Sequence, residues 1–116
     1  MAKKILVVDD SATVRLQVRG ALLRAGYEVL EAVDGVDAYA QLQASTDIAA
    51  VVCDVNMPRM DGIELLEKVK AGPPTLMLTT EGEPALVARA KLAGAKGWLV
   101  KPFKSDVLVA ALGRLA

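Results

Sequence analysis

Five side chains that could take part in chemistry come after short apolar runs of the sequence: Asp9, Asp10, Asp54, Thr79 and Lys101. If each run is a strand of a parallel sheet, these side chains meet at one edge, because ligands bind beyond the carboxyl ends of such strands. Each residue alone has a simpler explanation, since an Asp after a strand is more often a turn former or a helix cap. Their occurrence together favours a shared site.

The three carboxylates indicate a site for a hard divalent cation. Carboxylates brought close together repel one another unless a cation lies between them. Oxygen ligands without His or Cys suit Mg²⁺, which keeps several waters and leaves positions for phosphoryl oxygens. Lys101 adds a positive charge for phosphate, and Thr79 adds a hydroxyl donor. The set predicts phosphoryl transfer, which depends on positioning and charge neutralisation.

The chain contains no histidine, and this limits the possible nucleophiles. Ser-His-Asp catalysis, Cys-His catalysis and histidine-ligated zinc are excluded. Ser11 and Thr79 therefore lack an activating base, whereas an aspartate is already ionised and can form an acyl phosphate. We assign this role to Asp54, because its strand is expected to be central and acidic neighbours are available for the metal. A phosphohistidine donor would have to be another protein.

Length and composition predict one globular domain that spans residues 1–116. The 116 residues are 53% hydrophobic and 24% charged, and the formal net charge is zero. Zero net charge argues against direct binding of nucleic acid. The single Cys53 cannot form an internal disulfide and is best explained as a small apolar core residue. The N-terminal apolar run is too short for a signal peptide or a membrane span, so we expect a cytoplasmic protein without membrane attachment.

Apolar runs alternate with amphipathic stretches, as is typical of an α/β fold with a parallel sheet. We expect strands at residues 5–8, 27–31, 48–53, 75–78 and 97–100. We expect helices from about residue 14 to 25, from 35 to 43, from 62 to about 70, from 84 to 93 and from 105 to 115. Asp34 and Asp61 are expected to cap the second and third helices. The pattern predicts a three-layer, doubly wound (βα)5 domain.

Four motifs in order carry a family resemblance: Val7-Val8-Asp9-Asp10-Ser11, Asp54-Val55-Asn56-Met57-Pro58-Arg59-Met60-Asp61-Gly62, Leu78-Thr79-Thr80-Glu81 and Lys101-Pro102-Phe103. With these motifs the chain resembles response-regulator receiver domains of the single-domain CheY-like kind, over essentially its whole length. The resemblance implies a five-stranded parallel sheet of order 2-1-3-4-5, as in flavodoxin-like folds, and a cis Lys101-Pro102 bond. One departure is the interval between Asp54 and Thr79, which is shorter than usual.

The resemblance also implies a phosphorylation-dependent switch of a two-component or phosphorelay system. Asp54 would accept a phosphoryl group from a histidine kinase or a phosphotransfer protein, and the domain would later remove the phosphate itself. It would not act as an enzyme on other substrates. Lys101 and Thr79 would bind the phosphoryl group. The implied ligands of Mg²⁺ are the carboxylates of Asp9, Asp10 and Asp54 and the backbone carbonyl of Asn56.

Further positions have implied roles in switching and tuning: Trp98, Asn56, Thr80 and Glu81. Trp98 occupies the place of a switch aromatic, although it also suits a partly covered position on the sheet. Asn56 and Glu81 would border the acyl phosphate and permit rapid loss of phosphate, as in chemotaxis-type regulators. A downstream target would bind the face made by the fourth helix, the fifth strand and the fifth helix, where Val109 and Ala110 are expected to face outward. The protein would be a monomer or a weak dimer.

Two other functions remain open from the residues alone. A small phosphatase could use an aspartyl-phosphate intermediate, although such enzymes often separate two aspartates by one residue, and Asp9 and Asp10 are adjacent. A structural binding module could have the fold without the chemistry, although the complete acidic set argues against this. Asp61 is a rival phosphoacceptor, but its position before Gly62 favours a helix cap.

Overall fold

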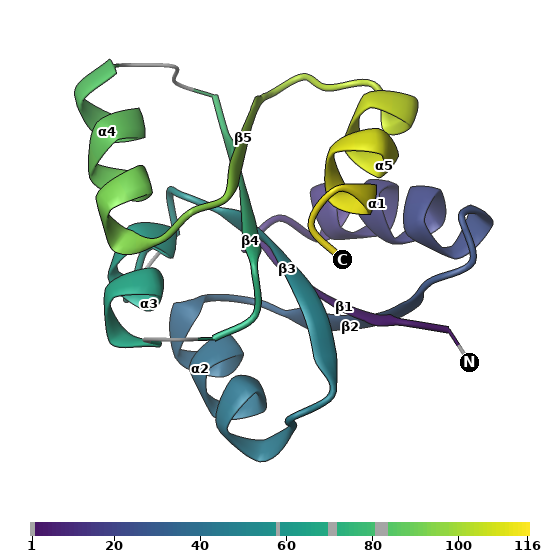
Figure 1. Ribbon diagram of the computed structural model, residues 1–116, viewed down its shortest axis with the longest axis horizontal. Helices are drawn as coiled ribbons and strands as arrows, with labels where there is room; N and C mark the ends of the chain where they lie inside the picture. Colours follow the sequence, from purple (N-terminus) through teal and green to yellow (C-terminus); the bar gives the residue numbers. More distant parts are fainter. Residues whose placement is uncertain (1, 58, 70–71, 81–83) are drawn as a thin grey trace.

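A computed structural model describes residues 2–57, 59–69, 72–80 and 84–116 of the chain. Strands and helices alternate along the whole of it, as the apolar pattern predicted (Figure 1). The strands are β1 (Lys4–Val8), β2 (Glu28–Ala32), β3 (Ile48–Asp54), β4 (Thr75–Thr79) and β5 (Gly97–Val100). The helices are α1 (Ala12–Arg24), α2 (Gly35–Ala44), α3 (Gly62–Lys68), α4 (Pro84–Ala93) and α5 (Ser105–Gly113).

The five strands form one parallel sheet of order β2-β1-β3-β4-β5, which confirms the predicted topology. After β1 the chain adds β2 on one side of it, and then adds β3, β4 and β5 in turn on its other side. The strand order therefore changes direction between β1 and β3. This switch point is where open α/β sheets bind ligands. The ends of β1 and β3 are therefore the place to look for a site.

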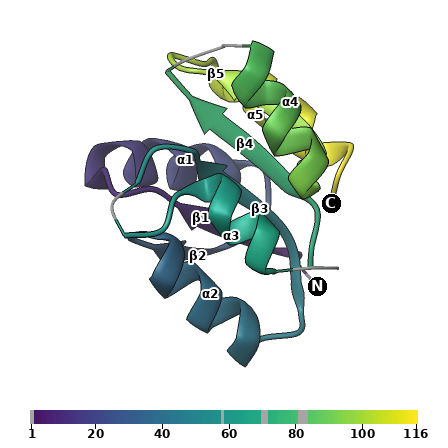
Figure 2. The ribbon, with the colours of Figure 1, turned by 90° about the vertical axis from the view of Figure 1, so that its left-hand side faces the viewer.

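Two layers of helices cover the sheet, with α1 and α5 on one face and α2, α3 and α4 on the other (Figures 1 and 2). Successive residues of β1 point to opposite faces, and this alternation divides the core. Ile5 and Val7 pack in the cluster under α1 and α5, whereas Leu6 and Val8 pack in the cluster under the other three helices. Coverage on both faces explains why the strands are continuous apolar runs in the sequence.

Side chains at the helix starts confirm both predicted caps. The Asp34 carboxylate accepts the backbone N–H of Asp37 at the start of α2. Asp61 and Glu64 form a capping box at the start of α3, in which each side chain accepts the other residue's backbone N–H. Such caps satisfy backbone N–H groups that the first helical turn leaves unpaired.

Two expectations about helices differ from the structure. Helix α3 ends at Lys68, where Lys70 was expected; residues 70 and 71 lie outside the described part of the chain. In α5, Val109 was expected to face outward, but it packs against the core cluster under α1 and α5, and Val107 is the valine that is 45% exposed. The helix is apolar almost all round, so its sequence does not show which side faces the core. Ala110 is exposed, as expected.

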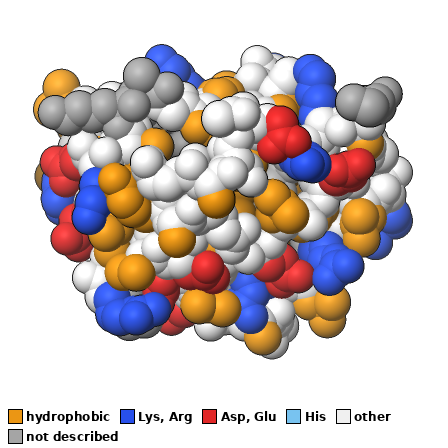
Figure 3. All heavy atoms as spheres, turned by 90° about the horizontal axis from the view of Figure 1, so that it is seen from below, with side chains coloured by type: hydrophobic (Ala, Val, Ile, Leu, Met, Phe, Trp, Pro, Cys, Tyr) orange, Lys and Arg blue, Asp and Glu red, His pale blue; other side chains and the backbone are white. Residues whose placement is uncertain are grey.

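Charges of both signs are mixed on the surface. On the face shown in Figure 3, acidic and basic side chains lie close together and are interspersed with apolar ones. Among the described residues, no helix is both long enough and apolar enough to cross a bilayer.

Candidate functional site

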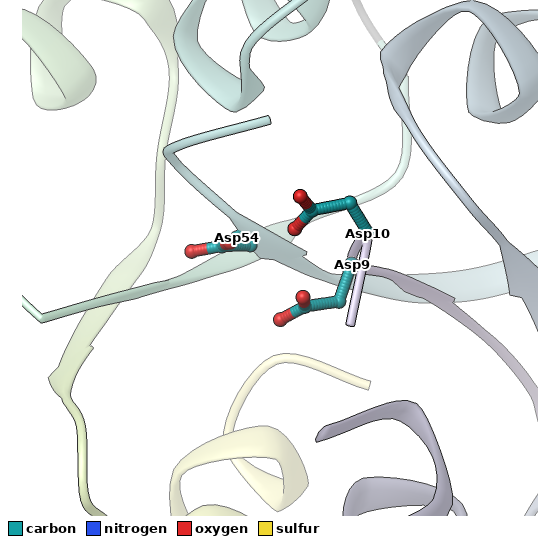
Figure 4. Close-up of side chains that lie close together, drawn as sticks. All are labelled: Asp9, Asp10 and Asp54. Carbon is teal, nitrogen blue, oxygen red and sulfur yellow. The ribbon is translucent and has the colours of Figure 1, made fainter. Parts of the chain in front are cut away.

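The carboxylates of Asp9, Asp10 and Asp54 gather at the carboxyl ends of β1 and β3 (Figure 4). One oxygen of each lies within 4.8 Å of the others. Asp9 and Asp54 are 1% and 5% exposed, whereas Asp10 is exposed to solvent. Two buried carboxylates with a third at the rim form an all-oxygen set that is open on one side.

Asp9 is held in place from three directions. The backbone N–H of Ser11 donates to its carboxylate at 2.9 Å, and Asp9's own N–H donates to the carbonyl of Ala32 at 3.2 Å. From α1, the Arg15 guanidinium donates to the Asp9 carbonyl at 2.7 Å while also pairing with Glu31. These bonds fix the turn after β1, so the carboxylate meets a ligand without having to be ordered first.

Lys101 extends from the end of β5 to both buried carboxylates. Its Nζ lies 3.0 Å from an Asp9 oxygen and 3.3 Å from an Asp54 oxygen, and its side chain is only 15% exposed. The backbone N–H of Lys101 donates to the carbonyl of Thr79 at 2.6 Å, which ties the ends of β5 and β4 together. The peptide bond from Lys101 to Pro102 is cis, as the resemblance implied.

The pKa of Asp54 is raised, first by burial and then by the negative charge of Asp9, and Lys101 offsets this only in part. Burial by itself would lower the pKa of Lys101, but its hydrogen bond to Asp9 and the charge of Asp54 outweigh burial and raise that pKa. The ammonium group of Lys101 thus pairs with two of the three carboxylates. The site has an excess of negative charge, which a divalent cation would neutralise.

The loop after β3 leaves the strand in a tight path. The N–H of Val55 donates to the carbonyl of Leu78 at 3.0 Å, and the N–H of Gly62 donates to the carbonyl of Val55 at 2.9 Å. A Cβ on Gly62 would lie 2.3 Å from the carbonyl oxygen of Asp54. Only glycine allows α3 to begin so close to the residue that carries the central carboxylate.

The remaining predicted site residues that the structure describes differ in exposure. Thr79 is fully buried at the end of β4, while Thr80 and Asn56 are exposed. Glu81 lies outside the described residues. Trp98 packs against the core cluster beneath α4, and its indole N–H is buried without an acceptor in the described part of the chain.

Cys53 and Asp61 do not join the site as chemical groups. Cys53 is fully buried, and the pKa of its thiol is strongly raised by that burial and by the negative charges of Asp54 and Asp9. The thiol is therefore protonated and packs as a small apolar side chain. Asp61 uses its carboxylate to cap α3, as expected.

An ion pair beside the site has no signal in the sequence. Arg59, in the loop after β3, donates to the buried carboxylate of Asp34 at the start of α2. The two residues are 25 positions apart, and no periodicity links them. Arg59 also has a positive φ of 67°, a conformation that its residue type rarely adopts.

Comparison with known proteins defines the class of the protein. Residues 5–113 match the model of the response regulator receiver domain, and the chain belongs to this family. Chemotaxis protein CheY1 of Helicobacter pylori is 46% identical, and the match covers 90% of each chain. The chemotaxis protein CheY homolog of Campylobacter jejuni is 44% identical over 90% of this chain and 85% of its own.

Solved structures agree with this assignment. Chemotaxis protein CheY4 of Vibrio cholerae is 42% identical over the whole of both chains, with a TM-score of 0.93. CheY in the CheX–CheY–BeF3–Mg²⁺ complex of Borrelia burgdorferi is 26% identical over 97% of this chain and 87% of that one, with a TM-score of 0.91. The chain is thus a receiver domain of the CheY type, a two-component signalling switch for which a chemotaxis-type role fits.

Family membership favours one of the functions that the residues alone left open. Receiver domains are signalling proteins rather than classical enzymes, which argues against both the phosphatase and the purely structural module. They bind Mg²⁺ at an acidic pocket, and the donor set found here, three carboxylates with no nitrogen or sulfur ligand, fits that ion.

Proposed function

We propose that Asp54 accepts a phosphoryl group from the phosphohistidine of a histidine kinase or a phosphotransfer protein. In this step an oxygen of the Asp54 carboxylate attacks phosphorus, the P–N bond breaks, and its electron pair returns to the imidazole of the donor. The observation that carries the proposal is the position of Asp54, which is buried at a strand end, 3.3 Å from Lys101 and grouped with two other carboxylates. An ionised carboxylate in such a place is a nucleophile that needs no base.

The carboxylates of Asp9, Asp10 and Asp54, with the backbone carbonyl of Asn56, would hold Mg²⁺. When bound, the ion supplies positive charge that offsets the phosphoryl oxygens. Lys101 is already in reach of Asp54, so its ammonium group binds a phosphoryl oxygen after leaving Asp9 or Asp54. The Thr79 hydroxyl donates to another phosphoryl oxygen. Asp9, Asp54 and Lys101 already lie together, and such preorganisation limits the rearrangement that the reaction needs.

Loss of the phosphate belongs to the same pocket. A water molecule attacks phosphorus, the bond between phosphorus and the Asp54 oxygen breaks, and the carboxylate is regenerated. We assign control of the approach of this water to Asn56, Thr80 and Glu81, of which Asn56 and Thr80 are exposed in the described part of the chain. An amide and a carboxylate at these positions favour rapid loss, so a phosphorylated state that persisted for many hours would contradict this assignment.

The partners would use two different surfaces. A hollow of about 320 Å³ beside Lys101, lined also by Val14 and Phe103, gives the phosphodonor an apolar approach to the pocket. A larger hollow of about 640 Å³ lies between β5 and α5, with Trp98 and the exposed Val107 in its lining. We assign the downstream target to this second surface, the α4–β5–α5 face. The balanced surface charge favours protein partners over nucleic acid.

We further propose that residues 1–116 act as a single receiver domain in the cytoplasm, as a monomer or a weak dimer. The match to the family model from residue 5 to residue 113 supports one domain. The cytoplasm is where a phosphohistidine donor would meet it, and the reduced, buried thiol of Cys53 is consistent with that compartment.

Incubation with acetyl phosphate and Mg²⁺, followed by intact-mass measurement, tests the proposed phosphorylation. The wild-type chain is expected to gain one phosphoryl group, and Asp54→Asn none. Continued release of phosphate with multiple turnovers on unrelated phosphomonoesters would instead indicate a phosphatase. A chain that gains no mass and releases no phosphate would be a structural module, and the proposal would be wrong.

Trp98 offers a second test, because it is the only tryptophan of the chain. If it moves on activation, its fluorescence changes when beryllofluoride and Mg²⁺ mimic the phosphorylated state. An unchanged spectrum on a complex whose formation has been confirmed independently would show that Trp98 is a fixed core residue.

A further inference from the structure

The loop that connects β3 to α3 is held by α2 as well as by the sheet. Its two ends are fixed by the bonds of Val55 to Leu78 and of Gly62 to Val55. Between these ends the described residues are exposed or half-buried, and Asn56 is exposed. In this middle part Met57 and Met60 pack against the core cluster under α2, α3 and α4, and Arg59 and Met60 also contact the start of α2.

Arg59 makes the stronger of the two contacts. Its Nε donates to an oxygen of Asp34 at 2.9 Å, and its Nη2 donates to the same oxygen. The other Asp34 oxygen accepts the backbone N–H of Asp37 at 2.9 Å, so both oxygens of this buried carboxylate are engaged. Asp34 is thereby fixed to α2, and it presents a rigid acceptor to the arginine.

The backbone of the loop also presses against α2. A Cβ on Gly35 would lie 2.5 Å from the carbonyl oxygen of Met60, so the loop occupies the space that a side chain would need. The positive φ of Arg59 bends the chain into this contact. A bulky residue in that conformation is uncommon and is retained where its surroundings determine it.

We propose that Arg59 is a positioning residue for the Mg²⁺ site, acting through its ion pair with Asp34. This inference rests on the proposed function, in which the carbonyl of Asn56 is a ligand of the ion. Asn56 is exposed and lies three residues before Arg59, in the same loop. Clamping the loop to α2 fixes where that carbonyl points before the ion arrives, as outer partners of metal ligands commonly do.

A positioning role and simple electrostatics predict opposite changes in Mg²⁺ affinity when Arg59 is removed. Loss of a positive charge near an acidic pocket would strengthen the binding of a cation. The positioning role predicts that binding weakens, so the sign of the change separates the two. Overall stability is expected to change little, because the Arg59 side chain is 63% exposed and lies outside the core.

Isothermal titration calorimetry with Mg²⁺ tests the proposal on four variants. Arg59→Asn keeps a residue that tolerates positive φ but removes the guanidinium. We expect it to weaken Mg²⁺ binding about tenfold, the low end of the losses seen when an outer partner is removed. Arg59→Lys, with a single point of contact, should fall between it and the wild type. Asp34→Asn should weaken binding, and the double variant Asp34→Asn/Arg59→Asn should bind no worse than either single variant, because one interaction is lost in all three.

Arg89→Gln is the matched control, since it removes one positive charge from the exposed pair that Arg89 makes with Glu67 at 3.5 Å. It should leave Mg²⁺ affinity unchanged. If wild type and Arg59→Asn bind Mg²⁺ equally, or if Arg59→Asn binds it more tightly, the positioning role is wrong while the metal site stands. If the wild type itself does not bind Mg²⁺, the proposed function fails and this inference fails with it.

Discussion

Lys101 lies between Asp9 and Asp54 at the edge of the sheet where the carboxyl ends of the strands meet. At the opposite edge, where the strands begin, Lys4 pairs with Asp47 at 2.6 Å. The side chains of the second pair are 38% and 59% exposed, whereas those of Lys101 and Asp9 are 15% and 2% exposed. An exposed pair is screened by water and contributes little. A buried pair fixes the geometry of its side chains, so the same two residue types have different uses at the two edges.

The largest expected difference between the edges is in the rate of phosphorylation. Lys101→Ala should slow phosphorylation of Asp54 by acetyl phosphate about a hundredfold or more, the typical effect of losing one preorganised donor to developing charge. Lys4→Ala, at the other edge, should leave the rate unchanged. Intact-mass time courses would measure both. Equal rates in the two variants would mean that Lys101 has no special role.

A second difference concerns the response to Mg²⁺. An ion bound only by the native state should stabilise it by about 1.4 kcal/mol at ten times its dissociation constant. Asp10→Asn should weaken this response, while Asp47→Asn should respond as the wild type does. Melting curves at millimolar Mg²⁺ would measure both variants. A melting temperature that does not change with Mg²⁺ would contradict the metal site.

A third difference concerns stability without the metal. The pKa of Asp54 is raised by burial and then by Asp9, so its ionised form destabilises the fold. Asp54→Asn should raise stability at neutral pH by about 1 kcal/mol, or about 4 °C in melting temperature. The advantage should shrink as pH falls through the raised pKa of Asp54, because the native carboxyl then takes up its proton. It should disappear below the unfolded value of about 3.9.

Thermal unfolding of wild type and Asp54→Asn at several pH values would check this pattern. A difference that stays constant from neutral to acidic pH would mean that ionisation of Asp54 is not its cause.

The smallest effect belongs to the exposed pair. The hydrogen bond and charge of Lys4 lower the pKa of Asp47, yet both side chains are in solvent. Lys4→Ala and Asp47→Asn should therefore leave the unfolding midpoint unchanged within error. A clear loss of stability in both variants, measured by urea denaturation, would show that the contrast between the edges is weaker than their burial indicates.

The alternation of strands and helices and the grouping of the acidic residues could be predicted because both depend on local pattern, whereas the order of the strands followed from the family resemblance. Continuous apolar runs mark strands covered on two faces, and parallel strands bring the residues after them to one edge. Asp9, Asp54 and Lys101 were placed together for this reason alone, although they are far apart in the sequence. The roles assigned to them remain predictions that the experiments above would test.

The exposed side of α5 was predicted wrongly for a physical reason. When nearly every position of a helix is apolar, the pattern has no polar side, and Val107 cannot be distinguished from Val109. The ion pair of Arg59 with Asp34 could not be predicted at all. It depends on a loop conformation with positive φ, which residue type does not specify for an arginine.

The buried N–H of Trp98 bears on how much of the unphosphorylated protein adopts the active form. A donor without an acceptor costs about 1–3 kcal/mol, and any conformation that turns this N–H toward water avoids that cost. If Trp98 turns toward water on activation, as the fluorescence test would detect, the cost falls on the resting form only. About 1.4 kcal/mol changes a ratio of populations tenfold, so the tryptophan would then shift unphosphorylated molecules toward the active form.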